Sequence, residues 1–257
     1  LAAALRGDCH THTTWSDGMH TIEEVARYVK KNLPYRYIAL TDHSKASRIA
    51  NGMDEKQFRQ QLKAIREVNE KLGEDFVKSG AEVDILPDGA LDMSDEVLAQ
   101  FDIVVASIHA SFNRDNTERL IKACENPYVA VIGHPTGRLI GSRDAYPVDM
   151  RRLIEAARET GTALEINAQP NRMDLNDEWA RLAREKSVKL VISTDMHQLS
   201  NFNYMKLGIL VARRAWCTAY DVLNTGKWKD VQVFIEKKRK CIGRSSKGFH
   251  LADWLHG

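Results

Sequence analysis

Seven short apolar or β-branched runs alternate with amphipathic stretches along this 257-residue chain. Runs of this length and composition are typical of buried strands. The predicted strands cover residues 5–10, 35–41, 76–83, 102–108, 128–133, 162–167 and 189–194. Strands that alternate with helices in this way indicate a parallel sheet built from βα units.

Helix start signals stand between the predicted strands. Thr21, Asp54, Ser94 and Asp149 each precede a stretch with helical periodicity. Their side-chain oxygens can accept hydrogen bonds from the first backbone amides of a helix. We therefore expect helices to begin directly after these four residues.

Potential metal ligands lie at the ends of the predicted strands. Side chains at positions i and i+2 of an extended segment point to the same face, so His10 with His12, and Asp195 with His197, can reach one ion together. The full set is His10, His12, Asp17, His43, Glu82, His109, His134, Asp195 and His197. An open sheet would spread these residues along a line, whereas a closed barrel brings its strand ends around one mouth. The prediction is an α/β fold, a distorted (β/α)7 TIM-like barrel, with a metal cluster at the C-terminal ends of its strands.

The ligand types indicate the chemistry of the site. Imidazole and carboxylate groups without thiolates favour zinc, manganese or iron. Nine candidates exceed what one ion can bind, so we expect two or three divalent ions with Glu82 as a bridging carboxylate. Neighbouring ions lower the pKa of a shared water and hold phosphoryl oxygens, which predicts a metal-bound hydroxide that attacks a phosphoester. The residues expected to act in catalysis are His10, His12, Glu82, Asp195 and His197.

Length and composition limit the class of protein. We predict one domain over residues 1–240, followed by an irregular tail over 241–257 that is appended or non-native. The four cysteines are far apart, as in a reduced cytoplasmic protein rather than a disulfide framework. No stretch approaches the roughly 18–20 apolar residues of a membrane span, and we expect no membrane partner. The net charge of +2 permits a nucleic-acid partner without requiring one.

Several motifs resemble those of a known family. D-C-H-T-H-T-T-W-S-D-G, T-D-H-S, A-S-I-H, G-H-P-T-G-R and S-T-D-M-H are similar to motifs of the polymerase and histidinol phosphatase (PHP) family. Residues 133–225, with A-L-E-I-N-A, D-L-N-D-E and D-V-L-N-T, resemble more specifically the C-terminal PHP domain of bacterial- and archaeal-type family X DNA polymerases. The resemblance covers about residues 5–240 and lacks the polymerase part, which suggests an excised domain of a larger chain.

The resemblance also implies a division of the ligands among three zinc or manganese ions. It assigns His10, His12, Glu82 and Asp195 to one ion, Glu82, His109 and His134 to a second, and Asp17, His43 and His197 to a third. It further implies a phosphoesterase that acts as a 3′–5′ exonuclease on DNA ends, in end trimming or abasic-site cleavage during DNA repair.

Weaker candidates for substrate contact lie near these motifs. Arg138 and Arg172 could each bind a substrate phosphate or merely anchor a loop. Phe112 could stack on a base or cover its own core. Residues 206–247 hold eleven Lys or Arg against three acidic residues, which indicates a solvated face or a rim that attracts phosphate.

Three functions from different classes fit the sequence. The first is a metal-dependent phosphodiesterase on DNA ends. The second is a broad or small-molecule phosphatase similar to histidinol phosphatase, because a mouth with three ions can also accept monoesters. The third is a catalytically silent PHP module that braces a polymerase. A catalytically silent module should lack some of the metal ligands, and all nine are present.

Overall fold

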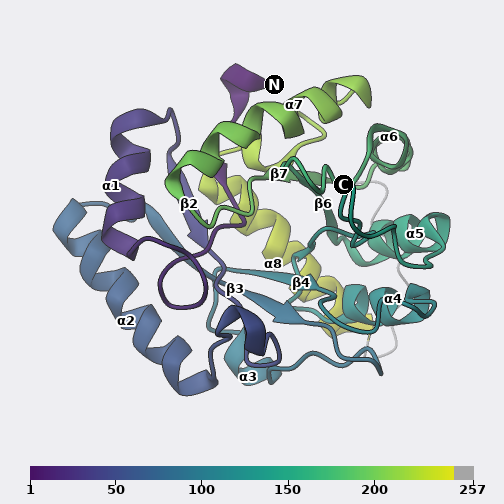
Figure 1. Ribbon diagram of the computed structural model, residues 1–257, viewed down its shortest axis with the longest axis horizontal. Coiled ribbons are helices and arrows are strands. Elements are labelled where there is room, and N and C mark those ends of the chain that lie inside the picture. Colours follow the sequence, from purple (N-terminus) through teal and green to yellow (C-terminus); the bar gives the residue numbers. More distant parts are fainter. Residues whose placement is uncertain (246–257) are drawn as a thin grey trace.

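The computed structural model describes residues 1–245, and seven parallel strands form its centre (Figure 1). The strands pair in chain order, each with the next. They are β1 (Gly7–Asp8), β2 (Tyr37–Leu40), β3 (Val77–Asp84), β4 (Ile103–Ser107), β5 (Val131–Ile132), β6 (Ala163–Asn167) and β7 (Leu190–Ser193). The predicted distorted (β/α)7 barrel is therefore confirmed.

Strands β1 and β5 are the most shortened relative to their predicted ranges, because local turns occupy their first residues. The amide of Ala4 donates to the carbonyl of Leu1 at 2.8 Å, so a 3₁₀ helix, η1 (Ala2–Ala4), precedes β1. The amide of Val129 donates to the carbonyl of Asn126, and this turn delays the start of β5. The carboxyl ends of both strands lie close to their predicted positions, so the residues that follow them are placed as expected.

The seam between β1 and β7 is closed by a side chain. Asn224 is buried, and its amide nitrogen donates to the carbonyls of Gly7 at 2.8 Å and Ile192 at 2.7 Å. Its side-chain oxygen accepts from the amide of Ile192 at 3.1 Å. Farther up the seam, the amide of His12 donates to the carbonyl of Met196 at 2.8 Å. The first and last strands are thus held together although neither pairs with the other along its length.

In the described part of the chain, seven α-helices surround the strands and one more crosses beneath them (Figure 1). They are α1 (Ile22–Asn32), α2 (Glu55–Leu72), α3 (Asp95–Leu98), α4 (Thr117–Glu125), α5 (Met150–Thr160), α6 (Asp177–Glu185), α7 (Met205–Arg214) and α8 (Trp228–Ser245). Short 3₁₀ helices are η2 (Arg48–Ala50), η3 (Leu199–Tyr204) and η4 (Leu223–Thr225). All four predicted start residues occupy N-cap positions, and the side chains of Thr21, Asp54 and Asp149 accept the expected backbone hydrogen bonds.

The barrel interior is apolar and is closed from below by α8. Tyr37 and Ile103, at the beginnings of β2 and β4, pack in one cluster with Val231 and Ile235 of α8. Cys9 belongs to this cluster, as expected of a buried apolar residue. Helix α8 therefore covers the amino-terminal ends of the strands, which leaves the opposite ends open for a site.

The position of α8 bears on two predictions about the last part of the chain. The helix continues to Ser245, so residues 241–245 are not irregular as predicted, and residues 246–257, with His250 and His256, lie outside the described part. The exposed lysines of α8 lie at the end of the barrel opposite to the predicted ligands, which favours a solvated face over a phosphate-attracting rim. Within residues 1–245 we find no helix that is both long and apolar enough to span a membrane.

Candidate metal centre

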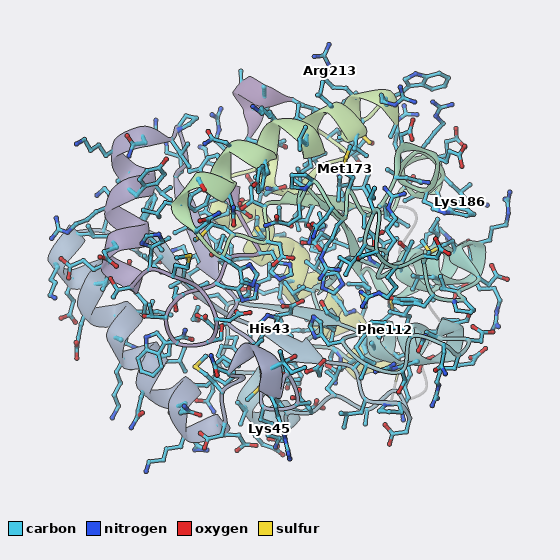
Figure 2. The ribbon with its side chains drawn as sticks, in the orientation of Figure 1. His43, Lys45, Phe112, Met173, Lys186 and Arg213 are labelled. Atoms are coloured by element: carbon cyan, nitrogen blue, oxygen red, sulfur yellow. The ribbon has the colours of Figure 1, made fainter. Side chains whose placement is uncertain are left out.

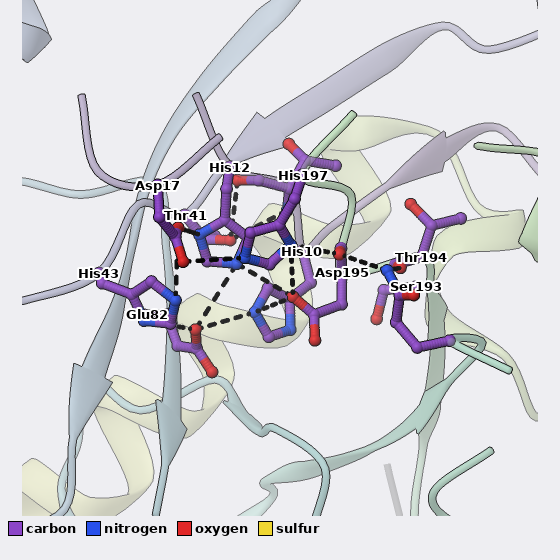
Figure 3. Close-up of polar contacts among 12 residues, drawn as sticks. His10, His12, Asp17, Thr41, His43, Glu82, Ser193, Thr194, Asp195 and His197 are labelled. Carbon is purple, nitrogen blue, oxygen red and sulfur yellow. Dashed lines mark hydrogen bonds and ion pairs between the residues drawn. The ribbon is translucent and has the colours of Figure 1, made fainter. Parts of the chain in front are cut away.

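All nine predicted ligands gather at the carboxyl ends of the strands. Glu82 lies within β3, and the others lie in the segments that follow β1, β2, β4, β5 and β7. Figure 2 shows His43 near the middle of this face, and Figure 3 shows how the side chains from different strands point toward one another. The set is His10, His12, Asp17, His43, Glu82, His109, His134, Asp195 and His197.

Glu82 lies at the centre of the cluster and is 1% exposed. Its Oε2 lies 2.9 Å from Nδ1 of His43 and 3.2 Å from Nε2 of His10. Its Oε1 lies 3.0 Å from Nε2 of His134 and 3.4 Å from Nε2 of His109. One carboxylate therefore faces imidazoles from four different strand ends, the arrangement that a bridging ligand requires.

Two further carboxylates flank Glu82. Oδ1 of Asp195 lies 3.1 Å from Nε2 of His12. Oδ2 of Asp17 lies 3.3 Å from Nε2 of His197, and its Oδ1 lies 3.7 Å from Nε2 of His43. The cluster thus extends from the β5 side, through Glu82, to the loop that follows β1.

The imidazoles fit divalent metal ions. Nε2 of His10, both ring nitrogens of His12, Nδ1 of His43 and Nδ1 of His134 are buried and form no hydrogen bond with the described residues, although carboxylate oxygens lie close to three of them. Buried polar atoms are normally paired, and unpaired imidazole nitrogens next to carboxylates are the donor set that zinc, manganese and iron prefer. The residues present therefore fit the predicted ions.

Three overlapping groups have ligand atoms within 4.8 Å of one another. They are His12, Asp17, His43 and His197; His10, His12 and Asp195; and His43, Glu82 and His109. Each group contains most of one predicted ion's ligands. His12 and His43 each belong to two groups, so the division among three ions stays a prediction.

The electrostatics of the cluster reflect its three carboxylates. Burial raises the pKa of Glu82, but His10, His43 and His109 outweigh this effect and hold the pKa well below its usual range. Burial lowers the pKa of His109, but Glu82 and its other acidic neighbours raise it to about 10. Burial, with the charge of Arg172, lowers the pKa of His134 to about 4. The carboxylates thus require positive charge, which protons or divalent cations can supply.

Two carboxylates that the sequence interpretation missed orient the predicted ligands. Glu165 is fully buried in β6 and accepts from Nδ1 of His10 at 2.7 Å and from the backbone amide of His134 at 2.6 Å. Asp84 accepts from Nδ1 of His109 at 2.8 Å. A carboxylate behind a ligating imidazole fixes the ring and its tautomer. The available signals were Glu165 inside the predicted strand 162–167 and Asp84 directly after the predicted strand 76–83, at the i+2 position that shares a strand face with Glu82.

A third buried carboxylate holds the loop that contains Asp17. Asp42 accepts from the amide and hydroxyl of Thr13, both at 2.7 Å, and from the hydroxyl of Ser16 at 2.6 Å. The amide of Gln61, from α2, also donates to Asp42 at 2.5 Å. The position of Asp17 is therefore set by buried contacts rather than by its own half-exposed side chain.

Two of the predicted ligands have left-handed backbone conformations. The φ angle is 28° at His134 and 49° at Asp195. Such angles are unfavourable for residues other than glycine and are concentrated at functional sites. The fold holds these two side chains in the cluster despite that cost.

The two predicted substrate-binding arginines have different surroundings. Arg138 donates through Nε to the carbonyl of Arg172 at 2.7 Å, and through Nη2 to the carbonyl of Met173, so its guanidinium anchors a loop. Arg172 lines the same cavity of about 550 Å³ as His134 and Asp195. Its Nη1 is buried without a hydrogen-bond partner in the described part, and its Nε lies 3.6 Å from Oδ2 of Asp195. Phe112 stacks with Tyr146 and with the guanidinium of Arg143, so its ring faces are engaged within the protein.

Comparisons with known proteins agree with this geometry. The family model described as PHP domain matches residues 8–169. A Bacillus subtilis (strain 168) protein named DNA polymerase/3′-5′ exonuclease PolX is 46% identical over 237 residues, which are 91% of this chain but only 41% of that protein. A protein named probable phosphatase from Thermoanaerobacter sp. (strain X514) is 33% identical over 251 residues, 92% of this chain and 97% of that protein.

A solved structure shares the fold. Histidinol phosphate phosphatase from Lactococcus lactis, complexed with zinc, L-histidinol and phosphate, aligns with a TM-score of 0.56 over 95% of this chain and 94% of that chain, at 14% identity. The family match and the two relatives establish the membership that the strand-end motifs predicted. The chain belongs to the PHP domain family of metal-dependent phosphoesterases.

Proposed function

We propose that this protein hydrolyses phosphodiester bonds at DNA 3′ ends, using two or three divalent ions held by the nine clustered residues. The observation that carries this proposal is the contact of one buried carboxylate, Glu82, with imidazoles from several strands on the wall of an open cavity. Imidazole and carboxylate ligands without thiolates suit zinc, manganese or iron.

The residues of the cluster have different proposed roles. His10, His12, Glu82, Asp195 and His197 are the side chains proposed to touch the reacting centre. When bound, divalent ions would supply positive charge to the phosphoryl oxygens and lower the pKa of water. Glu165 and Asp84 hold His10 and His109 as hydrogen-bond donors through Nδ1, which directs each Nε2 toward Glu82.

Arg172 is the proposed phosphate-binding residue. The residue lines the cavity beside Asp195, and its buried Nη1 has no hydrogen-bond partner in the described part of the chain, so a substrate phosphate would complete its hydrogen bonds. A guanidinium in this position supplies directed donors to phosphate oxygens. Because Arg138 already donates to two backbone carbonyls, we propose that it acts only indirectly, by holding the segment that contains Arg172.

DNA as substrate is supported by the Bacillus subtilis relative, whose name includes a 3′-5′ exonuclease. The chain spans 41% of that relative, so the activity of the whole relative is carried over only as a proposal. We place this activity in the cytoplasm, where the buried thiols of Cys9, Cys124 and Cys217 would stay reduced. We further propose that one phosphoesterase domain extends at least to Ser245.

A second candidate function is a small-molecule phosphatase. The Thermoanaerobacter relative named probable phosphatase matches this chain over nearly its whole length and has no room for a polymerase part. A catalytically silent structural module is the least favoured alternative, because all nine predicted ligand residues are present and lie close together.

The test compares substrates on protein loaded with manganese or zinc. The wild type should shorten a 3′-recessed DNA duplex and hydrolyse bis(p-nitrophenyl) phosphate faster than p-nitrophenyl phosphate. Preference for the monoester with no shortening of DNA would contradict the nuclease proposal and support the phosphatase.

A variant pair tests the role of Glu82. Glu82→Ala should lose metal content and activity together, because its carboxylate faces imidazoles of several ion groups. Glu159→Ala removes a side chain that is 57% exposed on α5 and should lose neither. Full activity of Glu82→Ala would contradict the bridging role.

A further inference from the structure

The cavity above the metal centre has two unlike walls. On the β5 and β6 side it is lined by His134 and by the cation Arg172. On the β2 and β3 side it is lined mainly by apolar side chains from two loops, together with Ser47 and Arg48 of the first loop. We call Ile49, Leu86 and Pro87 the apolar shelf; Ile49 is fully exposed to solvent, at 103%. Apolar side chains on the wall of a cavity that also holds a few polar groups are typical of sites for organic ligands.

The loop that presents Ile49 is anchored by buried carboxylates. Asp92 accepts from the hydroxyl of Ser44 at 2.7 Å and from the amide of Ala46 at 2.9 Å. Asp84 accepts from the hydroxyl of Ser47 at 2.6 Å, while it also accepts from His109 of the metal centre. The loop over residues 44–53 is therefore fixed to the same carboxylate that orients a predicted ligand.

The other end of this loop is equally constrained. The amide of Met53 donates to the carbonyl of His43 at 2.8 Å, and the amide of Gly52 donates to the carbonyl of Ser47 at 3.0 Å. A Cβ atom at Gly52 would lie 1.9 Å from the carbonyl oxygen of Ser44, so only glycine fits. Figure 2 shows Lys45, at the start of the loop, directed away from His43. The exposure of Ile49 thus follows from a defined loop conformation.

The cavity is larger than a phosphate group needs. Its volume of about 550 Å³ lies within the range of roughly 300–1,000 Å³ typical of pockets for organic ligands. A phosphate held between the predicted ions and Arg172 would leave the space beside Ile49 for the organic group of the ester.

We propose that the apolar shelf of Ile49, Leu86 and Pro87 is a binding subsite for a flat apolar group of the phosphoester, an aryl ring or a nucleobase. The subsite rests on the proposed function, because it presumes a phosphate at the metal centre. The shelf and Arg172, on opposite walls, orient the ester across the mouth. Burial of part of a ring against these side chains supplies roughly tenfold in affinity.

Two phosphonates test the subsite without any need for hydrolysis. Phenylphosphonate and methylphosphonate share one head group, and phosphoesterases do not cleave their P–C bond. Calorimetric titration of the zinc-loaded protein should show roughly tenfold tighter binding of phenylphosphonate. Ile49→Asp should remove most of this preference, whereas Ile140→Asp, the same change at a 53% exposed isoleucine outside the cavity, should retain it.

The outcomes separate the subsite from the proposed function. Equal affinity of the wild type for the two phosphonates, or binding of neither, would overturn the subsite even if DNA is hydrolysed. The same holds if Ile49→Asp keeps the phenyl preference. A protein that prefers phenylphosphonate through Ile49 but cleaves no ester would instead overturn the proposed function alone.

Discussion

Lys238 should make the stability of this protein depend on pH in a way that one substitution removes. The residue is 1% exposed in α8. Its Nζ donates to the carbonyl of Cys124 at 2.7 Å and to the hydroxyl of Thr162. Burial lowers its pKa from 10.5 to about 7, against a smaller opposing effect of Cys124. The folded protein therefore holds a neutral lysine at alkaline pH and a buried ammonium below neutrality.

The sign and size of the effect follow from proton linkage. Between pH 7 and pH 10.5 the unfolded chain binds more protons at Lys238 than the folded protein does, so the free energy of unfolding rises with pH. The slope approaches about 1.4 kcal/mol per pH unit, and the full window corresponds to roughly 5 kcal/mol. Below pH 7 both states are protonated and the penalty is constant. Lys238→Met removes this dependence, at a pH-independent cost of about 1–2 kcal/mol for the lost hydrogen bonds.

Denaturant unfolding of the metal-loaded protein at pH 6.5, 8 and 9.5 measures the effect. Taking the difference between wild type and Lys238→Met cancels the titration of the metal-centre imidazoles, which both proteins share. The stability of the variant relative to wild type should fall by about 3 kcal/mol from pH 6.5 to pH 9.5. Lys237→Met, at the exposed neighbouring position, should show a constant difference. A constant difference for Lys238→Met as well would refute the reasoning.

Three further predictions concern the site and its loop. Glu165→Gln should lower metal affinity about 10–100-fold in a chelator competition, because an amide cannot accept from all of the donors that Glu165 serves; unchanged affinity would remove its orienting role. Gly52→Ala should lower the thermal midpoint, since its Cβ would meet the Ser44 carbonyl at 1.9 Å; an unchanged midpoint would mean that the loop can shift. Chelation with EDTA should also lower the midpoint of the loaded protein, because imidazole nitrogens of His10, His12 and His43 would be left buried without partners; a midpoint insensitive to chelator would contradict metal binding there.

Local patterns explain what the sequence could predict. The apolar runs and N-cap residues depend on neighbours a few positions away, so the seven strands and the starts at Thr21, Asp54 and Asp149 could be inferred directly. The convergence of the strand-end residues followed from barrel closure. Closure through Asn224 could not be inferred, because its partner Gly7 lies 217 positions away and no periodicity marks such a contact.

The sequence could not predict which of two residues of the same type has which partners in the folded protein. Arg138 and Arg172 both follow strand-end motifs, yet Arg138 is held by backbone carbonyls, whereas Arg172 lines the cavity and its buried Nη1 has no hydrogen-bond partner among the described residues. The apolar shelf could not be predicted for the same reason. Ile49 is apolar by type, and only the folded loop shows that it faces the cavity rather than the core.

Strand β6 shows most clearly why ligand spacing alone describes this site incompletely. Among the strands of residues 1–245 it is the one with no predicted ligand, yet Glu165 accepts from His10 after β1 and from the amide of His134 after β5. Asn167, on the same face of the strand, donates to Oδ2 of Asp195 after β7 at 3.0 Å. Ligands from three other strands are thus oriented from one strand. A side chain that orients a ligand must point into the barrel, as the ligand itself does. A polar residue inside an apolar run therefore predicts either a ligand or a residue that orients one.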